Sequence, residues 1–456
     1  MQSLNCREIL KATGGKLEAE SENTIFTGIS TDSRKIKSGD LFIPLSGLNF
    51  DGHDFVGKAM ELGAAGTIAS KDLELPDGRL LIKVNDTSAA LRDIAAFYRQ
   101  KFNVPFVGIT GSVGKTSTKD MVACALGGKY KVLKTEGNLN NEIGVPLTVF
   151  NLEGTHEAAV VEMGMSGFGE ISRLTAIVKP HVAIITNIGI AHIEKLGSRQ
   201  NILKAKMEIL EGLEKNGLVI LNGDDTLLRG ASNYIDFRKK LYGIEEKCDY
   251  QAGNIKTHGE AGSDFEITVG NVEYKVRVPV PGIHNIYNAL AAIAAGVELG
   301  VPMQAIIAGI AQFNPGKMRL NIFEKNGIKI IDDAYNANPQ SMQAALNVLQ
   351  DISAGARKIA VLGDMLELGE WAGKAHYDVG KYAASKGVEH IIAVGPNASQ
   401  VALGAYEGGC EKGNTAIFGT NSEALQYLNN IVREGDIILV KGSRGMKMEE
   451  IVNGLQ

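Results

Sequence analysis

Short apolar runs separated by stretches long enough for a helix recur through most of the chain. Between residues 84 and 313, the candidates for buried strands are residues 106–109, 158–161, 182–185 and 218–221. Continuous apolar runs are typical of strands buried on both faces, and helical connections between them indicate parallel order. The pattern predicts a parallel, doubly wound sheet in this region.

The α/β rhythm changes near residue 265 and then resumes. Residues 265–278 alternate in polarity around Gly270-Asn271, which predicts a hairpin, and a helix is expected at about 285–299, closed by Gly300. After Pro315-Gly316, strands are expected at 328–331, 358–362, 390–394 and 436–440. This last third predicts a second, Rossmann-like sheet.

The first 83 residues form a smaller α/β unit in this interpretation. Strands are expected at 40–44 and 80–84 and a helix at 55–63, whereas residues 30–55 are dense in Ser, Asp, Gly and Asn and favour loops. A chain of 456 residues is long enough for three domains. We therefore predict an α/β fold with domains at 1–83, 84–313 and 314–456.

Composition narrows the class of protein. The 47 basic and 52 acidic residues give a net charge of -5 without any Lys/Arg block, so nucleic acid is not favoured as the main partner. The four cysteines are far apart and form no C-x-x-C pair, which argues against a disulfide framework and a zinc site. The N-terminus lacks the pattern of a secretory signal, and no run of eighteen apolar residues occurs. We expect a cytoplasmic protein without membrane insertion.

The stretch FVGITGSVGKTST, residues 106–118, predicts a strand, a phosphate-binding loop and a helix beginning near Thr118. Glycines let backbone N–H groups surround oxyanions, Lys115 adds a point charge, and Thr116 is suited to ligate Mg²⁺. The common pattern has a glycine where this chain has Ile109. A plain glycine-rich turn is the alternative interpretation.

Polar residues follow two of the predicted strands of this sheet. Glu162 ends the run 158–161, and His192 comes shortly after the run 182–185. Ligands bind beyond the carboxyl ends of strands in such sheets, so both side chains are expected to converge on a cation held by Thr116. A charged glutamate beside valines is costly unless it meets a metal or a partner. The alternatives are an exposed loop position for Glu162 and a structural histidine at 192.

Three further groups of polar residues have no single interpretation. Lys204 and Lys206 lie on a predicted helix at 199–213, where periodicity alone assigns them to a solvated face. The polar cluster after the strand 328–331 suits recognition of a ribose, a base or a peptide; it comprises Asp332, Asp333, Tyr335, Asn336 and Asn338. Lys441 and Arg444 follow the last strand and are equally compatible with anion binding and with a structural role.

Several longer stretches, taken together, are specific enough to indicate a protein family. They are GITGSVGKTS, EGNLNNEIGVPLT, VEMGMSGFGEI, NIGIAHIEKLGS, PGIHNIYNALAA, MRLNIF, IIDDAYNANPQSM and VLGDMLELG. Nearly the whole chain resembles the Mur ligases of peptidoglycan synthesis, and the shortened phosphate loop is the form that this superfamily uses. Within the superfamily, GNLNNEIGVP and DDAYNANP resemble the branch that adds D-alanyl-D-alanine to UDP-N-acetylmuramoyl-tripeptide.

This resemblance implies a UDP-binding first domain, a central ATPase domain and a Rossmann-like last domain. It also implies a reaction in which ATP phosphorylates the terminal carboxylate of the tripeptide and the amine of the dipeptide attacks the acyl phosphate. The cofactors implied are ATP and Mg²⁺, as two ions, and the protein is expected to be a monomer.

The resemblance also assigns roles to individual residues. Lys115, Lys206 and His192 are implied as catalytic, with Lys206 carried as a carbamate, a modification that turns a cation into an anionic metal ligand. The implied metal ligands are Thr116, Glu162, His192 and Lys206. The implied ATP contacts are Gly111, Ser112, Val113, Gly114, Lys115, Thr116, Ser117, Asn285, Arg319 and Asp332. The implied substrate contacts are Ser33, Leu48, Asn49 and Phe50 for uridine diphosphate, and Asn138, Asn141, Ser166, Tyr335, Asn336 and Asn338 for the two peptides.

Two other functions compete with this interpretation. Another amide ligase of the same superfamily, such as one that joins glutamate to folate, would share the central domain but not the UDP-binding first domain. A nucleotide-dependent switch would bind ATP without forming an amide. The sequence contains no motif that distinguishes a tripeptide ending in lysine from one ending in diaminopimelate.

Overall fold

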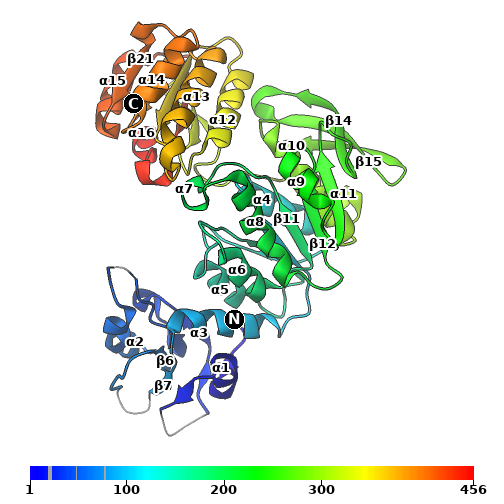
Figure 1. Ribbon diagram of the computed structural model, residues 1–456, viewed down its shortest axis with the longest axis vertical. Coiled ribbons are helices and arrows are strands. Elements are labelled where there is room, and N and C mark those ends of the chain that lie inside the picture. The colour runs from blue at the N-terminus through cyan, green and yellow to red at the C-terminus, as the bar shows by residue number, and fades with distance from the viewer. Residues whose placement is uncertain (19–22, 48, 76–78, 456) are drawn as a thin grey trace.

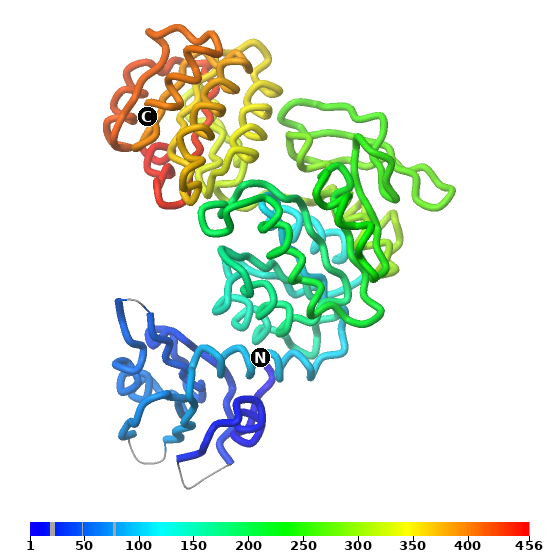
Figure 2. Tube along the Cα trace, in the orientation of Figure 1, coloured from blue at the N-terminus to red at the C-terminus, as the bar shows by residue number. Residues whose placement is uncertain are grey.

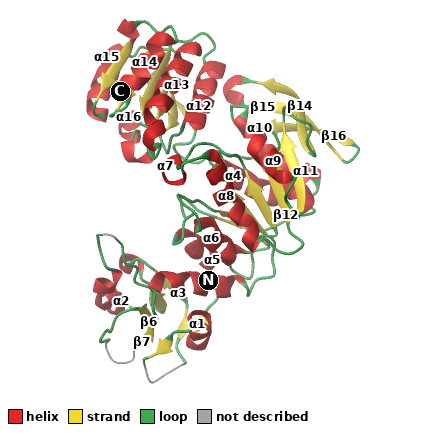
Figure 3. Cartoon of the chain, in the orientation of Figure 1, coloured by secondary structure: helices red, strands yellow, loops and turns green. Residues whose placement is uncertain are grey.

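The computed structural model describes residues 1–18, 23–47, 49–75 and 79–455. The chain forms three α/β units arranged along the long axis of the molecule, with the first unit at one end and the last at the other (Figure 1). In each unit helices flank strands, as Figure 3 shows.

The first unit contains a five-stranded sheet in the order β2-β7-β6-β5-β4, parallel except for β2. The predicted strands and helix are confirmed as β5, β7 and α2. A long helix, α3, follows the sheet and packs against α1 as well as against α5 and α6 of the central unit. The elements up to this connecting helix are β1 (Leu4–Asn5), α1 (Cys6–Thr13), β2 (Lys16–Leu17), β3 (Ile25–Phe26), β4 (Gly28–Ser30), β5 (Asp40–Phe42), α2 (Val56–Glu61), β6 (Gly66–Ala69), β7 (Leu80–Lys83) and α3 (Thr87–Arg99) itself, with short 3-10 helices at Ser33–Lys35 and Gly52–Phe55.

The central unit is built on a nine-stranded sheet in the order β16-β15-β14-β13-β12-β11-β8-β10-β9. The strands from β9 to β14 are parallel, and β15 and β16 add an antiparallel hairpin that turns at Gly270-Asn271, as predicted. Its strands are β8 (Phe106–Thr110), β9 (Val132–Lys134), β10 (Ala158–Glu162), β11 (Val182–Ile185), β12 (Leu218–Asn222), β13 (Arg238–Gly243), β14 (Tyr250–Thr257), β15 (Ser263–Val269) and β16 (Val272–Val278).

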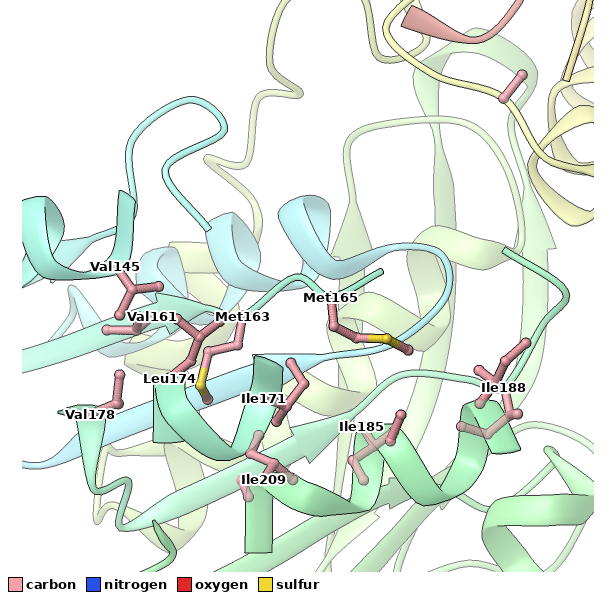
Figure 4. Close-up of a cluster of buried hydrophobic side chains, with 14 of the residues drawn as sticks. Val145, Val161, Met163, Met165, Ile171, Leu174, Val178, Ile185, Ile188 and Ile209 are labelled. Atoms are coloured by element: carbon pink, nitrogen blue, oxygen red, sulfur yellow. The ribbon is translucent and has the colours of Figure 1, made fainter. Parts of the chain in front are cut away.

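Helices cover both faces of this sheet and bury its apolar strands. Figure 4 shows one face, where Val161 of β10 and Ile185 of β11 meet Ile171 and Leu174 of α6. On the other face α4 and α10 pack together. The helices are α4 (Lys115–Leu126), α5 (Gly144–Phe150), α6 (Glu170–Val178), α7 (Ile193–Leu196), α8 (Arg199–Met207), α9 (Thr226–Ser232), α10 (His284–Glu298) and α11 (Met303–Ile310), with 3-10 helices at Glu208–Gly212 and Gly259–Ala261.

Two helix boundaries in this unit differ from the prediction. Helix α4 begins at Lys115, three residues before the expected start at Thr118. The apolar pattern is uninformative there because the first turn carries Lys115, Thr116 and Ser117, which face the ligand side of the loop. The predicted helix at 199–213 ends as an α-helix at Met207 and continues as a 3-10 helix to Gly212.

The last unit has a six-stranded sheet in the order β17-β18-β22-β19-β20-β21, in which only β17 is antiparallel to its neighbour. The four predicted strands are confirmed as β18, β19, β20 and β22. The tube in Figure 2 shows the last described residues, in red, within this unit. The elements are β17 (Asn321–Lys325), β18 (Ile328–Asp333), α12 (Pro339–Ile352), β19 (Lys358–Gly363), α13 (Ala372–Ser385), β20 (His390–Val394), α14 (Ala398–Glu407), β21 (Thr415–Phe418), α15 (Asn421–Ile431), β22 (Ile437–Lys441) and α16 (Glu449–Gly454), with 3-10 helices at Gly369–Trp371, Lys412–Asn414 and Arg444–Met446.

Candidate active site

The phosphate loop lies where the order of the central sheet reverses. Strand β8 pairs with β10 on one side and β11 on the other, so the loop after β8 opens into the crevice between them. Gly114 has a φ of 81° and precedes α4 directly, and the Lys115 ammonium donates to the Gly111 carbonyl at 2.8 Å. A Cβ atom at Gly111 would lie 1.9 Å from the Thr186 hydroxyl. The loop therefore requires glycine at this position because a neighbouring strand end occupies the space.

Glu162 ends β10 beside the phosphate loop, opposite Ile109 in the sheet register. The carboxylate is buried. Its Oε1 accepts a hydrogen bond from the Asn140 amide at 2.7 Å, whereas its Oε2 is buried and has no hydrogen-bond partner among the residues that the structure describes. An unpaired carboxylate oxygen in the interior is costly, and a cation is the partner that would offset the cost. The exposed-loop alternative for Glu162 is wrong.

A single carboxylate, one hydroxyl and substrate phosphates suit Mg²⁺, which commonly keeps few protein ligands. Thr116 and Glu162 line the same cavity. Among the residues that the structure describes, no group of three or more His, Cys, Asp or Glu side chains could hold a metal alone. The donor set at this loop therefore fits a magnesium ion shared with a nucleotide.

Lys206 and Lys204 lie on different sides of α8. Lys206 is 2% exposed and Lys204 is exposed. Burial lowers the pKa of Lys206 well below its ordinary value, and the nearby charge of Lys115 lowers it further. In the described part of the chain, the Lys206 ammonium has no hydrogen-bond or ion-pair partner. The solvated-face interpretation is therefore wrong for Lys206 and correct for Lys204.

Lys115 is also desolvated. Burial lowers its pKa, the neighbouring Glu162 carboxylate counteracts that shift, and the Arg319 guanidinium adds to it. Lys115 is thus close enough to Arg319 for its pKa to be lowered and close enough to Lys206 to lower the pKa of that lysine, and Glu162 is the carboxylate that acts on Lys115. An excess of cationic groups in a buried region favours the binding of an anion.

His192 directly precedes α7 and is its N-cap residue. Its backbone is left-handed, with a φ of 62°, and its Nδ1 lies against the Glu367 carboxylate of the last unit. The contact with His192 lowers the pKa of Glu367. His192 lines the cavity, as expected, but its ring is held from the last unit rather than by Glu162.

These groups surround a cavity of about 710 Å³ between the central and last units. Most of the residues expected at the ATP and peptide sites line it: Ser112, Val113, Gly114, Lys115, Thr116, Ser117, Asn138, Asn141, Glu162, Ser166, His192, Asn285, Arg319, Tyr335, Asn336 and Asn338. Gly111, Lys206 and Asp332 are not in its lining. The cavity therefore joins the phosphate loop to the polar cluster after β18.

Asp333, rather than Asp332, faces this cavity. The Asp332 carboxylate turns to the Ala334 amide, and burial raises its pKa. Asp333 pairs with the Lys441 ammonium at 2.6 Å and accepts a hydrogen bond from the Leu320 amide at 3.1 Å. Successive residues of a strand point to opposite faces, so only one of the two aspartates can reach the ligand side. The sequence alone did not show which of the two aspartates faces the cavity.

Arg319 lies between two residues with left-handed backbones, Met318 and Leu320. Its guanidinium stacks on the Tyr335 ring, 4.1 Å from the centroid. Because Asp333 holds the Leu320 amide, this segment is anchored to β18 next to the cavity. Arg319 is thus positioned by the last unit.

Sequence reasoning missed several cavity residues. Asn140 holds Glu162, and Asn288 donates to the Asn285 side chain at 3.0 Å while accepting from the Thr118 hydroxyl at 2.9 Å. Burial lowers the pKa of His284 to about 4, so this ring is neutral near pH 7. Gln340 and Ser341 also line the cavity. The spacing of Asn285 and Asn288, three residues apart at a helix start, was the one usable signal.

The expected uridine diphosphate residues lie in the first unit. Ser33 begins a short 3-10 helix after β4, and Asn49 and Phe50 follow β5, the parallel neighbour of β4. Phe50 is 61% exposed. Leu48 lies outside the described residues. The described residues of this group thus share one edge of the five-stranded sheet, separate from the 710 Å³ cavity.

Three family models match the chain. The description Mur ligase family, catalytic domain, covers residues 25–99; Mur ligase middle domain covers residues 109–296; and Mur ligase, glutamate ligase domain, covers residues 318–444. Each match coincides with one of the three structural units.

Curated relatives match along nearly their whole length. A UDP-N-acetylmuramoyl-tripeptide--D-alanyl-D-alanine ligase of Bacillus subtilis is 39% identical over 99% of this chain and 97% of the relative. The protein of the same name in Escherichia coli is 35% identical over 96% of each chain.

Solved structures share the arrangement. A crystal structure of MurF from Acinetobacter baumannii has a TM-score of 0.92 and 34% identity, covering 100% of this chain and 99% of the other. MurF ligase from Thermotoga maritima in complex with ADP has a TM-score of 0.83 and 28% identity, covering 94% and 96%.

Fold and site together define a three-domain α/β protein that binds a nucleotide at a phosphate loop between two domains. The matches specify the class further: the chain belongs to the Mur ligase family. No helix among the described residues is long and apolar enough to cross a membrane.

Proposed function

We propose that this protein is an ATP-dependent ligase that adds D-alanyl-D-alanine to UDP-N-acetylmuramoyl-tripeptide. The products are UDP-N-acetylmuramoyl-pentapeptide, ADP and phosphate. The observation that carries the proposal is the shared cavity, in which the phosphate loop and Glu162 face a polar cluster of the last domain. Full-length relatives with this activity in their names support it.

The cavity residues suit an acyl phosphate route. The tripeptide carboxylate and the triphosphate repel each other, and Lys115 and Arg319 neutralise part of that charge while the γ-phosphoryl group moves to the carboxylate. The dipeptide amine then attacks the acyl carbon, and the tetrahedral intermediate expels phosphate. Since the protein forms no covalent bond in this route, its contribution is positioning and charge stabilisation.

We propose that Thr116 and Glu162 hold one magnesium ion and that His192 and carbamylated Lys206 serve a second. The buried, unpaired Glu162 Oε2 supports the first site. Magnesium would supply charge neutralisation at the phosphates. The lowered pKa of Lys206 supports the modification, because a neutral amine adds to carbon dioxide, forming an N–C bond and losing one proton.

The ligand contacts are proposals of the same kind. Asn285 and Arg319 face the nucleotide side of the cavity in this proposal, with Asp333 in the place first expected for Asp332. Asn138, Asn141, Ser166, Tyr335, Asn336 and Asn338 would contact the two peptides, and Ser33, Asn49 and Phe50 the uridine diphosphate. We also propose domain boundaries after residues 83 and 313, a monomeric state and a cytoplasmic location.

The two competing functions have less support. Folylpolyglutamate synthase from Mycobacterium tuberculosis shares the fold, with 15% identity and a TM-score of 0.63, over 81% of this chain. A nucleotide switch would not need the polar residues of the last domain that line the cavity opposite the phosphate loop.

Product analysis by mass separates these functions. Purified protein is incubated with ATP, Mg²⁺, UDP-N-acetylmuramoyl-tripeptide and D-alanyl-D-alanine. We expect a new species with the mass of the amide product. Nucleotide binding without this product would favour the switch, and product formation only with folate and glutamate would favour the other ligase.

A further inference from the structure

The segment from Thr186 to Glu194, here called the relay loop, holds the phosphate loop by hydrogen bonds. The Thr186 hydroxyl donates to the Val113 carbonyl at 2.6 Å, and the Asn187 side chain accepts from the Val113 amide at 2.9 Å and donates to its carbonyl at 3.0 Å. The Ser112 amide donates to the Asn187 carbonyl at 3.1 Å, and the Gly189 amide donates to the Ser112 hydroxyl at 2.9 Å. The position of the phosphate loop therefore depends on the relay loop.

The opposite side of the relay loop receives the last domain. A Cβ atom at Gly189 would lie 2.1 Å from Gln340 Oε1, so the Gln340 amide sits directly on this glycine. A Cβ atom at Gly369 would lie 3.1 Å from Glu194 Cγ, and Glu367 lies against His192. Three points of the last domain thus contact one short segment of the central domain.

The relay loop is braced between these two sides. Ile188 is fully buried, its amide donates to Asp225 at 2.8 Å, and its carbonyl accepts from the Arg199 guanidinium at 2.7 Å. Figure 4 shows Ile188 as a member of a cluster of buried apolar side chains. The relay loop is thus held on both sides of Ile188, and its Gly189 amide is bonded to the Ser112 hydroxyl.

Gln340 is itself fixed on the side of the last domain. It is the second residue of α12, whose start is set by Pro339 and by a capping box between Asn338 and Ser341. The Asn338 side chain accepts from the Ser341 amide at 2.9 Å, and the Ser341 hydroxyl accepts from the Asn338 amide at 3.0 Å. The helix start therefore directs Gln340 to the relay loop in one orientation.

We propose that Gln340 is a positioning residue that couples the placement of the last domain to the phosphate loop through Gly189. The turnover measurement below rests on the proposed ligase function. The coupling does not, because its contacts are present in the free protein. When the Gln340 amide is seated on Gly189, Ser112 and Val113 hold the geometry required for phosphoryl transfer.

The contact predicts a specific relation between two substitutions. In Gly189→Ala the new methyl group would lie 2.1 Å from Gln340 Oε1 and 3.2 Å from Ser112 Cβ, so the flexible end of the glutamine must move away. In Gln340→Ala the same contact is lost from the other side. The effects of the two variants should therefore be similar and should not add in the double variant.

The experiment measures kcat, the KM values and amide exchange in the two single variants and the double variant. We expect kcat to fall about tenfold in each, within the range typical of contacting residues. The KM for UDP-N-acetylmuramoyl-tripeptide should stay within about twofold of wild type. Hydrogen exchange in the free protein should accelerate in a peptide containing Ser112 and Val113. Gln350→Ala, an exposed position of the same helix, is the matched control and should change none of these quantities.

Two results would overturn the inference: additive losses in the double variant, or unchanged exchange at the phosphate loop in Gln340→Ala. Neither result bears on the ligase function. If wild-type protein forms no amide, the proposed function fails, and the exchange measurement still decides the coupling.

Discussion

At the scale of single residues, the site is defined by buried charges that lack ordinary partners. Within the described part of the chain Glu162 Oε2 has no hydrogen-bond partner, burial lowers the pKa values of both Lys115 and Lys206, and the charge of Lys115 lowers the pKa of Lys206 further. Such an arrangement is unfavourable for the free protein and becomes favourable when an anionic substrate and a cation enter. Buried groups with displaced pKa values of this kind are concentrated at functional sites.

Replacement of Lys115 tests the role of its charge. In Lys115→Ala the phosphoryl group loses a cation during transfer, so we expect kcat to fall by about 10²–10³, the typical cost of one electrostatic contact. The melting temperature should change little, because the side chain makes one hydrogen bond, to the Gly111 carbonyl. Turnover and thermal unfolding are measured together, and wild-type kcat in the variant would exclude the assigned role.

The two lysines of α8 provide a matched pair for the carbamate proposal. Lys206→Ala should lose activity, and added bicarbonate should not restore it, because the amine that accepts carbon dioxide is gone. Lys204→Ala should be mild since that side chain is exposed. Steady-state rates with and without bicarbonate decide the question, and the reverse ranking would move the assignment to Lys204.

Burial of Lys206 also makes stability depend on pH in protein freed of carbon dioxide. Its pKa is lowered in the folded protein, so between that pKa and the ordinary value of 10.5 the unfolded chain binds more protons. Stability should therefore rise with pH in this window, by up to about 1.4 kcal/mol per pH unit. Lys206→Met should flatten this slope in denaturant titrations at several pH values. Parallel curves for the two proteins would refute the explanation.

At the scale of the elements, strand order places the site. Strand β8 lies between β10 and β11, so the phosphate loop, Glu162 and the relay loop emerge at one edge of the sheet. The side of the loop that faces Thr186 leaves no space for a side chain at Gly111. The position of the phosphate loop therefore depends on the packing of Gly111 against the end of β11 as well as on the glycine pattern of the loop.

A methyl group at Gly111 tests this fit. Gly111→Ala should raise the KM for ATP and destabilise the fold by about 1–3 kcal/mol, because the side chain would overlap Thr186 in a backbone region that disfavours it. Gly57→Ala is the control: its Cβ would meet nothing within 4 Å, within α2. At this helix position alanine should raise the free energy of unfolding by about 0.5–1 kcal/mol. Equal effects of the two substitutions on unfolding would contradict the packing argument.

The sequence was sufficient to predict the strands that have strong apolar runs. It was insufficient for strands that are defined by their packing against neighbouring elements. The strands 106–109, 158–161 and 182–185 were predicted because all their side chains are buried. The edge strand β9 is only three residues long and half-buried, and β13 begins with exposed Arg238 and Lys239, so both have a weak apolar signature. Tertiary contacts define such strands.

The same distinction applies to the site. Glycine and lysine spacing identified the phosphate loop, and the strand end identified Glu162. Burial of Lys206 could not be derived from its helix, because the resemblance alone separated it from Lys204. The choice between Asp332 and Asp333 depends on which face of β18 is turned to the cavity, and the pairing of His192 with Glu367 joins two domains. Neither follows from local sequence.

At the scale of the whole molecule, the proposed reaction requires parts from separate domains. The phosphate loop belongs to the central domain, Arg319 and the polar cluster after β18 belong to the last, and the proposed uridine diphosphate contacts belong to the first. Chemistry should therefore proceed only when all three substrates are bound, because the central and last domains then hold their ligands at the shared cavity while the first domain holds the uridine diphosphate.

The most direct test of this account is the substrate requirement of ADP release. Release is measured with ATP and Mg²⁺ alone, with UDP-N-acetylmuramoyl-tripeptide added, with D-alanyl-D-alanine added, and with both. We expect sustained turnover only when both are present. Equal rates of ATP hydrolysis in all four mixtures would contradict the ligase function.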